Sequence, residues 1–151
     1  MRKVLLLILV TSALSCSAAM AADRASLDEA KVMALKAVDY LKENGPDKTF
    51  AAITAKDGPF HDRDLYVSVF DSRNGKMINV ANGNNPAFVG KDVIELADVD
   101  GIKFMRQESE VKDSEWVSYK WQDPLTKAVV KKKAFVVRSG DYVLACGAYS
   151  E

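Results

Sequence analysis

Apolar side chains recur every three or four positions across residues 27–41, which is the spacing of one face of an α-helix. Ser26, with Glu29 three residues later, is a capping-box pattern for the start of this helix. A Gly-Pro pair at 45–46 is a helix-termination signal, and Asp47 after it can cap a further turn or two. The pattern predicts a long helix followed by a short one.

From residue 65 onward, short runs rich in β-branched and aromatic residues alternate with clusters of turn formers. Residues 65–70 and 76–80 flank a turn at 71–75, so they predict an antiparallel hairpin. Asn, Gly and Pro dominate residues 81–86, which predicts a loop. The other expected elements are a short helix at 103–111 and strands at 115–121, 128–138 and 142–149. One α+β domain, with a long N-terminal helix packed on an antiparallel sheet of about five strands, is the simplest architecture.

The first residues have the order of a secretory signal peptide. A basic start at residues 1–3 precedes an unbroken apolar run at 4–10, and Ala19-Met20-Ala21 supplies a small-x-small cleavage pattern. The apolar run is far shorter than the ~20 residues that span a bilayer. We therefore expect cleavage near Ala21, which leaves residues 22–151 as a single periplasmic or secreted domain.

A lipoprotein cleavage site is the alternative interpretation of this segment. Ala13-Leu14-Ser15-Cys16 ends in a cysteine that could be acylated. The usual pattern has leucine first and a small residue second, and here that order is inverted. If cleavage follows Ala21 instead, Cys16 leaves with the signal peptide and Cys146 is the only cysteine of the mature chain.

Composition and charge exclude several classes of protein. The chain is 48% hydrophobic and 28% charged, with 21 basic and 21 acidic residues. Removal of the signal peptide leaves 19 basic residues against 21 acidic ones, which argues against a nucleic-acid-binding protein. The single histidine excludes a multi-histidine metal site, and the sequence contains no phosphate-binding loop or dinucleotide fingerprint. We therefore expect no metal and no cofactor.

Several stretches of the sequence, taken together, resemble a known family. They are Gly58-Pro59-Phe60, Asp64 to Val67, Asn85 to Asp92, Trp116 to Trp121 with Asp123-Pro124, and Asp141 to Leu144 with Gly147 and Tyr149. In this order and spacing they resemble a single Cache domain of the second type, over about residues 26–149. The resemblance implies a PAS-like extracytoplasmic sensor module that binds small organic ligands, often carboxylates or amino acids, on one face of its sheet.

The expected pocket residues follow from strand alternation and from this resemblance. Alternation places Tyr119 and Trp121 on one face of their strand, and Tyr66, Ser68 and Phe70 on one face of another. Tyrosine and tryptophan combine an apolar ring with a hydrogen-bond donor, which suits the wall of a small-ligand pocket. Lys132 matches the lysine of the family's Pro-Lys segment, which implies a cation for a ligand carboxylate. The six residues are thus predicted to bind ligand. The alternative interpretation makes the aromatic residues core and the lysines a solvated strand edge.

Departures from the family pattern limit what the resemblance implies. Residues 78–83 lack the histidine that members often carry there, and Lys131 stands where proline is common. No transmembrane or signalling segment follows Glu151, so we expect a free-standing domain.

The predicted function is therefore that of an exported, non-enzymatic sensor-type domain for a small organic acid or amino-acid-like ligand. The alternative is an accessory subunit that docks a membrane sensor or transporter without a ligand of its own.

One enzymatic and one metal-binding hypothesis have less support in the sequence than ligand binding. Cys146 with His61 could form a nucleophile and its base, but an apolar terminal strand favours a buried, inert thiol. Asp98 and Asp100 faintly resemble a calcium loop, but Gln107 stands where the required glutamate should follow, so we expect a turn.

Overall fold

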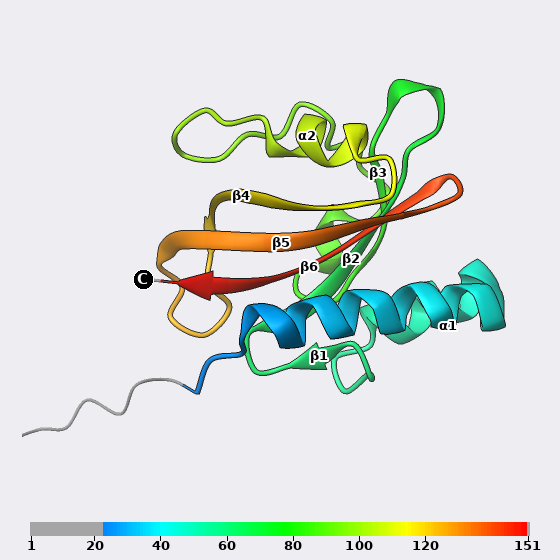
Figure 1. Cartoon of the computed structure of the whole chain (residues 1–151), viewed down its shortest axis with the longest axis horizontal. Coiled ribbons are helices and arrows are strands. Elements are labelled where there is room, and N and C mark those ends of the chain that lie inside the picture. The colour runs from blue at the N-terminus through cyan, green and yellow to red at the C-terminus, as the bar shows by residue number, and fades with distance from the viewer. Residues whose placement is uncertain (1–22, 151) are drawn as a thin grey trace, which may run out of the picture.

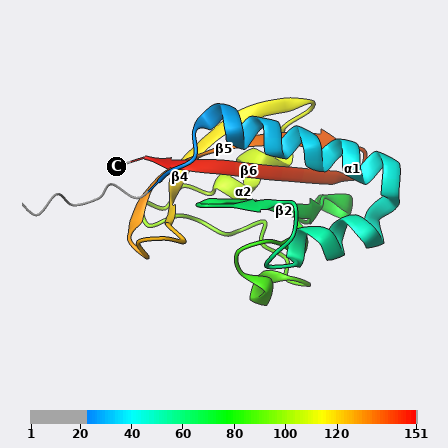
Figure 2. The ribbon, with the colours of Figure 1, turned by 90° about the horizontal axis from the view of Figure 1, so that it is seen from below.

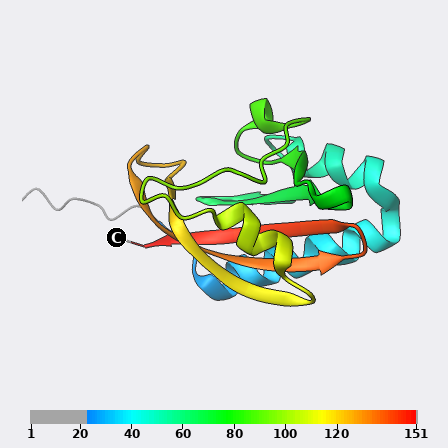
Figure 3. The same ribbon diagram turned by 90° about the horizontal axis from the view of Figure 1, so that it is seen from above.

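A computed structural model describes residues 23–150 of the chain. The predicted signal peptide, its cleavage site at Ala21 and the alternative lipidation site at Cys16 lie outside the described residues. Helix α1 (Leu27–Thr54) covers one face of an antiparallel sheet, and the short helix α2 (Phe104–Glu110) lies over the other face (Figures 1, 2 and 3). The α+β architecture predicted from the sequence is confirmed. No helix among the described residues is long and apolar enough to cross a membrane.

The sheet has six strands rather than about five. They are β1 (His61–Asp62), β2 (Leu65–Asp71), β3 (Ile78–Asn82), β4 (Ser114–Gln122), β5 (Val129–Ser139) and β6 (Tyr142–Ser150). The order is β1-β2-β6-β5-β4, with β3 also paired to β2, and every pairing is antiparallel. The extra strand is β1, which has only two residues and therefore no alternation that a sequence pattern could show.

The connections between strands mostly follow the predicted turns. The predicted hairpin forms between β2 and β3, and its turn contains the 3₁₀ segment Arg73–Gly75. Strand β3 continues to Asn82, so the loop expected at 81–86 starts only at Gly83. A second 3₁₀ segment, Pro86–Phe88, is capped by Asn85, whose side-chain oxygen accepts a hydrogen bond from the Ala87 amide at 3.1 Å.

Helix α1 begins at the predicted cap and changes direction at the predicted break. The Ser26 hydroxyl accepts from the Glu29 amide at 3.2 Å, and the Ser26 amide donates to the Glu29 carboxylate at 2.7 Å. Gly45 has φ 76° and ψ 173°, values outside the helical region, so the helix bends sharply there (Figure 2). Helical geometry resumes at Pro46, one residue before Asp47, so the expected cap at Asp47 is wrong.

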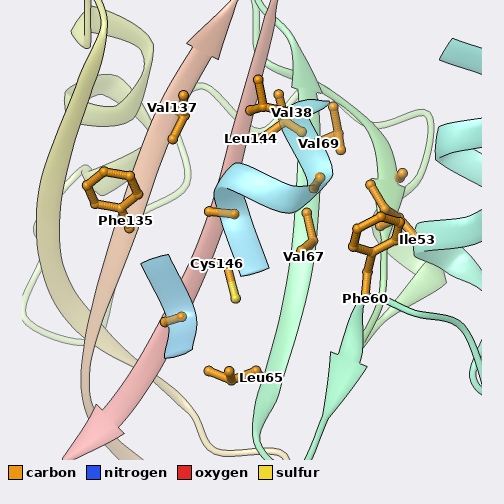
Figure 4. Packing of buried hydrophobic residues seen from close by; sticks show 14 of the residues in the cluster. Val38, Ile53, Phe60, Leu65, Val67, Val69, Phe135, Val137, Leu144 and Cys146 are labelled. Atoms are coloured by element: carbon orange, nitrogen blue, oxygen red, sulfur yellow. The ribbon is translucent and has the colours of Figure 1, made fainter. Parts of the chain in front are cut away.

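The main hydrophobic core lies between α1 and the sheet (Figure 4). Residues at alternate positions of three strands supply its floor, and one side of α1 covers them. The strand residues are Leu65, Val67 and Val69 of β2, Phe135 and Val137 of β5, and Leu144, Cys146 and Ala148 of β6. Phe60 and Ile53 are fully buried in this cluster. Each such side chain stabilises the fold by roughly 1.5–3 kcal/mol.

The intervening strand positions face α2 and build a second cluster. Its strand members are Phe70, Val117, Ala134, Val136, Val143 and Ala145, and α2 adds Phe104 and Met105. The sheet thus separates two groups of side chains, one under each helix. The second group includes the wall of the cavity described below.

The segment before α1 is tied to two turns of the sheet by ion pairs. The Arg24 guanidinium donates to the Asp123 carboxylate at 2.6 Å and to the Asp64 carboxylate at 3.5 Å. Both carboxylates are fully buried, and the Ala25 amide donates to Asp64 at 2.9 Å. These contacts fix the start of the described chain against the β1–β2 and β4–β5 turns.

Candidate ligand-binding cavity

A cavity of about 50 Å³ lies between the sheet and α2. All six residues predicted from the sequence line it, namely Tyr66, Ser68, Phe70, Tyr119, Trp121 and Lys132. The structure therefore brings together residues from β2, β4 and β5 that are up to 66 positions apart in the chain. Helix α2 closes the cavity with Phe104, Met105 and Glu108, and residues of the long segment between β3 and α2 complete the wall.

Lys132 is the basic residue among the described residues that line the cavity. Its side chain is buried, with 5% of the residue exposed, because strand alternation turns it inward while Lys131 and Lys133 remain exposed. The Lys132 ammonium donates one hydrogen bond, to the Tyr66 hydroxyl at 2.8 Å. It also lies 4.0 Å from the centre of the Tyr66 ring, a distance at which the ring face attracts a cation. The solvated-edge interpretation of Lys132 is therefore wrong.

The hydroxyl groups beside Lys132 form a chain with a defined direction. The Tyr149 hydroxyl donates to the Gln122 carbonyl at 3.1 Å, and it lies 3.1 Å from the Tyr66 hydroxyl. Because the Tyr149 proton is used on Gln122, Tyr66 must be the donor to Tyr149. Tyr66 consequently accepts from Lys132 and donates onward, so the network fixes both its proton and the position of the ammonium.

Gly147 provides the space that the Lys132 side chain crosses. A Cβ atom at this position would lie 2.7 Å from Lys132 Cε and 2.9 Å from the Cα atom of Ala134. Both distances are shorter than non-bonded carbon atoms tolerate, so any larger residue at this position would displace Lys132 or the backbone of β5. The glycine therefore acts through its missing side chain, and not through an unusual backbone conformation.

Glu108 is the acidic residue that the structure adds to the predicted set. It is fully buried, and neither of its carboxyl oxygens has a hydrogen-bond partner within residues 23–150. Burial raises its pKa to about 8, and this effect outweighs the opposing influence of the Lys132 ammonium and the Tyr119 hydroxyl. Sequence reasoning missed Glu108, although it lies four residues after Phe104 and so shares the apolar face of α2.

Asn79 is a second polar residue that sequence reasoning missed. It is 1% exposed, it lines the cavity, and both its amide nitrogen and its carbonyl oxygen lack partners in the described chain. Regular alternation would place Asn79 and Asn82 on opposite faces of β3. The register between β2 and β3 shifts at Val69/Phe70, so Asn79 pairs with Phe70 and Asn82 with Ser68. The irregularity lets both asparagines face the cavity.

Aromatic rings form the apolar wall of the cavity. The Tyr119 ring stacks on Phe104 with a centroid distance of 3.9 Å and an interplanar angle of 10°. Trp121 meets Phe104 edge to face at 5.4 Å, and Phe88 lies 6.3 Å from Trp121. Such pairs hold the rings in place in addition to burying them. The ring contacts therefore join β4 to α2 and to the segment that contains Phe88.

A wider surface groove of about 440 Å³ adjoins the cavity, and Asn84, Asn85, Phe88 and Trp121 line both. Asp98 also lines the groove, where its carboxylate accepts from the amides of Asp100, Ile102 and Lys120 at 2.9 Å each. These bonds lower the pKa of Asp98 and fasten its turn to β4. The turn expected at this position is confirmed.

Cys146 lies on the opposite face of the sheet, in the core under α1. It is 1% exposed, and burial raises the pKa of its thiol to about 12. A thiol in this state is not a nucleophile at neutral pH, because the thiolate is the reactive form. In residues 23–150, no group of three His, Cys, Asp or Glu residues is arranged to hold a metal ion.

The comparison with known families agrees with the arrangement of the long helix and the sheet. The sequence model of the family described as Single Cache domain 2 matches residues 6–151. The chain belongs to this family. Cache domains of this kind are sensor domains, and the family is not catalytic.

Three solved structures with the same fold are described as chemotaxis proteins or chemosensory domains. A periplasmic sensor domain of a chemotaxis protein is 19% identical, with a TM-score of 0.62, and the match covers 83% of this chain and 90% of that chain. A methyl-accepting chemotaxis protein from Vibrio parahaemolyticus is 23% identical, with a TM-score of 0.61 over 81% and 86%. A Cache chemosensory domain described for carboxylic acid recognition is 18% identical, with a TM-score of 0.61 over 83% and 88%. A search of curated proteins finds no match.

Proposed function

We propose that this Cache domain is exported and binds a small organic acid or an amino-acid-like molecule in the cavity under α2. The observation that carries the proposal is the state of Lys132. Its ammonium is buried and has three hydrogens, of which one is used on Tyr66 within the described chain. No carboxylate of residues 23–150 lies within ion-pair distance of it. A buried cation without a paired anion is costly, so a ligand carboxylate there would stabilise it.

The size of the cavity supports a ligand of very few atoms. One water molecule occupies about 10–15 Å³ of such a cavity. A volume of about 50 Å³ therefore holds about three to five non-hydrogen atoms. Acetate, propionate and glycine fall in this range. The structural relative described for carboxylic acid recognition shares the fold and supports the same class of ligand.

Export follows from the signal-peptide pattern, and it has a direct test. If residues 1–21 are cleaved, the mature protein recovered from the periplasmic fraction starts at Ala22. Mass analysis of the N-terminus measures this. An acylated Cys16 or an intact Met1 at the N-terminus would contradict the proposal.

A thermal-shift screen against short organic acids, amino acids and amines tests ligand binding. A compound that binds the folded state raises the melting temperature by mass action. Calorimetric titration of the best acidic hit then compares Lys132→Ala with Lys133→Ala, whose side chain is exposed on the same strand. Loss of a hydrogen bond to a charged group costs about 1.5–3 kcal/mol, so Lys132→Ala should weaken binding about ten- to hundredfold. Lys133→Ala should bind like the parent.

Two outcomes would contradict the proposal. Equal affinity of the parent and Lys132→Ala for an acidic hit would remove Lys132 from the binding site. A folded protein that binds none of the screened compounds would favour the alternative role, an accessory subunit that docks a membrane sensor or transporter.

A further inference from the structure

Lys132 and Glu108 both line the cavity, yet they do not form an ion pair. The Lys132 ammonium donates to Tyr66 instead, and both Glu108 oxygens lack hydrogen-bond partners among the described residues. An ionised carboxylate buried near an ammonium would be expected to pair with it, because an unpaired buried charge is very costly. The geometry is therefore that of a neutral carboxylic acid, with the Tyr119 hydroxyl nearby but no partner at hydrogen-bond distance in the described chain, so its O–H group can donate to a ligand.

The groups that face Glu108 agree with this protonation state. They are Tyr119 from β4 and Lys132 from β5, and Tyr66 from β2 lines the same cavity. Cys146 of β6 belongs to the core on the other face of the sheet. No second carboxylate and no histidine lines the cavity in the described chain. On α2 itself, Arg106 is exposed and pairs with Glu95, and Glu110 is exposed. Burial therefore dominates, and it holds the pKa of Glu108 near 8.

We propose that Glu108 is a specificity-determining residue that binds the ligand as a neutral acid, donating its O–H group to a carboxylate that Lys132 also contacts. The inference rests on the proposed function and narrows it to acids without an ammonium group. A cavity with neutral Glu108 and cationic Lys132 has one positive charge, which a monocarboxylate balances. A zwitterion such as glycine would need Glu108 to ionise, at the cost of releasing its proton.

The two ligand classes therefore have opposite pH dependence. A monocarboxylate keeps the proton on Glu108, so its affinity is constant below about pH 8. Above that pH the affinity falls by up to tenfold per unit, because two carboxylates would otherwise meet in the cavity. A zwitterion needs ionised Glu108, so its affinity rises by up to tenfold per unit as the pH approaches 8 from below.

Calorimetric titrations with acetate, propionate and glycine between pH 6 and pH 9.5 test the inference. Each titration is repeated in two buffers of different ionisation enthalpy, which counts the protons bound or released. The parent should bind acetate or propionate with no proton exchange at pH 6.5 and with uptake approaching one proton at pH 9. Glycine should bind at least tenfold more weakly than the better of the two acids at pH 6.5.

Variants separate Glu108 from the other titrating groups. Glu108→Gln keeps an N–H donor without a titrating proton, so it should bind the acid within about threefold of the parent at pH 6.5 and should lose the proton uptake at pH 9. Glu108→Leu removes the donor and should bind about tenfold more weakly. Glu110→Gln, on the exposed side of the same helix, should behave like the parent.

Each failure has its own meaning. Proton uptake that persists in Glu108→Gln, no uptake by the parent at pH 9, or tighter binding of glycine than of the acids would overturn the role of Glu108 while acid binding stands. The parent series alone decides the last two, even if a variant fails to fold. If acetate, propionate and glycine all fail to bind the parent at every pH, this inference falls together with the proposal of a small acidic ligand.

Discussion

Replacement of Glu108 by glutamine should make the free protein more stable at neutral pH, by an amount that grows with pH. The folded protein binds the Glu108 proton with a pKa of about 8, and the ordinary value of 4.5 applies to the unfolded chain. Between these two values the unfolded state loses a proton that the folded state keeps. The parent therefore has its full stability below about pH 4.5 and loses stability as the pH rises toward 8.

The magnitude follows from the difference between the two pKa values. Each unit corresponds to about 1.4 kcal/mol. At pH 7 the parent should be destabilised by about 3 kcal/mol relative to pH 4.5, and above pH 8 the loss should level off near about 5 kcal/mol. Glutamine has similar shape and no titrating proton, so Glu108→Gln should escape this loss.

Urea unfolding of the parent and the variant at several values between pH 5 and pH 9 measures the effect. The informative quantity is the difference in unfolding free energy between the two proteins, because contributions from distant carboxylates such as Asp71 cancel in it. The difference should increase steadily up to about pH 8 and then stay constant. Glu110→Gln, in an exposed position of the same helix, should show a difference from the parent that does not change with pH. A constant difference for Glu108→Gln as well would refute the reasoning, since it would mean that Glu108 is already ionised or solvated in the free protein.

Two other substitutions test the neighbourhood of Lys132 and the opposite face of the sheet. Gly147→Ala places a methyl group 2.7 Å from Lys132 Cε. It should therefore lower the unfolding free energy by about 1–3 kcal/mol in thermal unfolding and weaken binding of an acidic ligand. Stability and affinity equal to those of the parent would show that Lys132 does not need this space. Cys146→Ser should lower stability by about 1–2 kcal/mol and leave ligand affinity unchanged, and the parent thiol should resist thiol reagents until the protein unfolds. Rapid modification of the folded parent would contradict the buried, protonated state of Cys146.

The sequence was sufficient for those parts of the fold that local patterns determine. The capping box at Ser26 and the break at 45–46 are local signals, and alternation grouped Tyr119 with Trp121 on one strand and Tyr66 with Ser68 and Phe70 on another. These five residues and Lys132, which was predicted from the family resemblance, line one cavity.

The missed features depend on tertiary structure. Strand β1 has two residues and exists because β2 lies beside it. Asn79 faces the cavity together with Asn82 because the register between β2 and β3 shifts. Regular strand alternation assigns each residue to a face from its position in the sequence, so it cannot predict the effect of such a shift. Glu108 shares the apolar face of α2 with Phe104, but a charged residue in a short helix is usually exposed, so the sheet beneath the helix is needed to establish its burial.

The partition of side chains by the sheet has a consequence for how this domain can change. Along each long strand, one parity of residue number contributes to the core under α1 and the other parity contributes to the cavity or its surroundings. Substitutions of the first parity therefore act on the core under α1 alone, whereas substitutions of the second act on the cluster under α2 and, under the proposed function, on ligand preference as well. A combinatorial library aimed at new ligands should therefore vary cavity-lining positions of β2, β4 and β5 and keep the buried cluster residues Phe70, Val117, Ala134 and Val136 unchanged. A single-residue insertion or deletion within a strand would exchange the two sets, so insertions and deletions should be tolerated only in the turns.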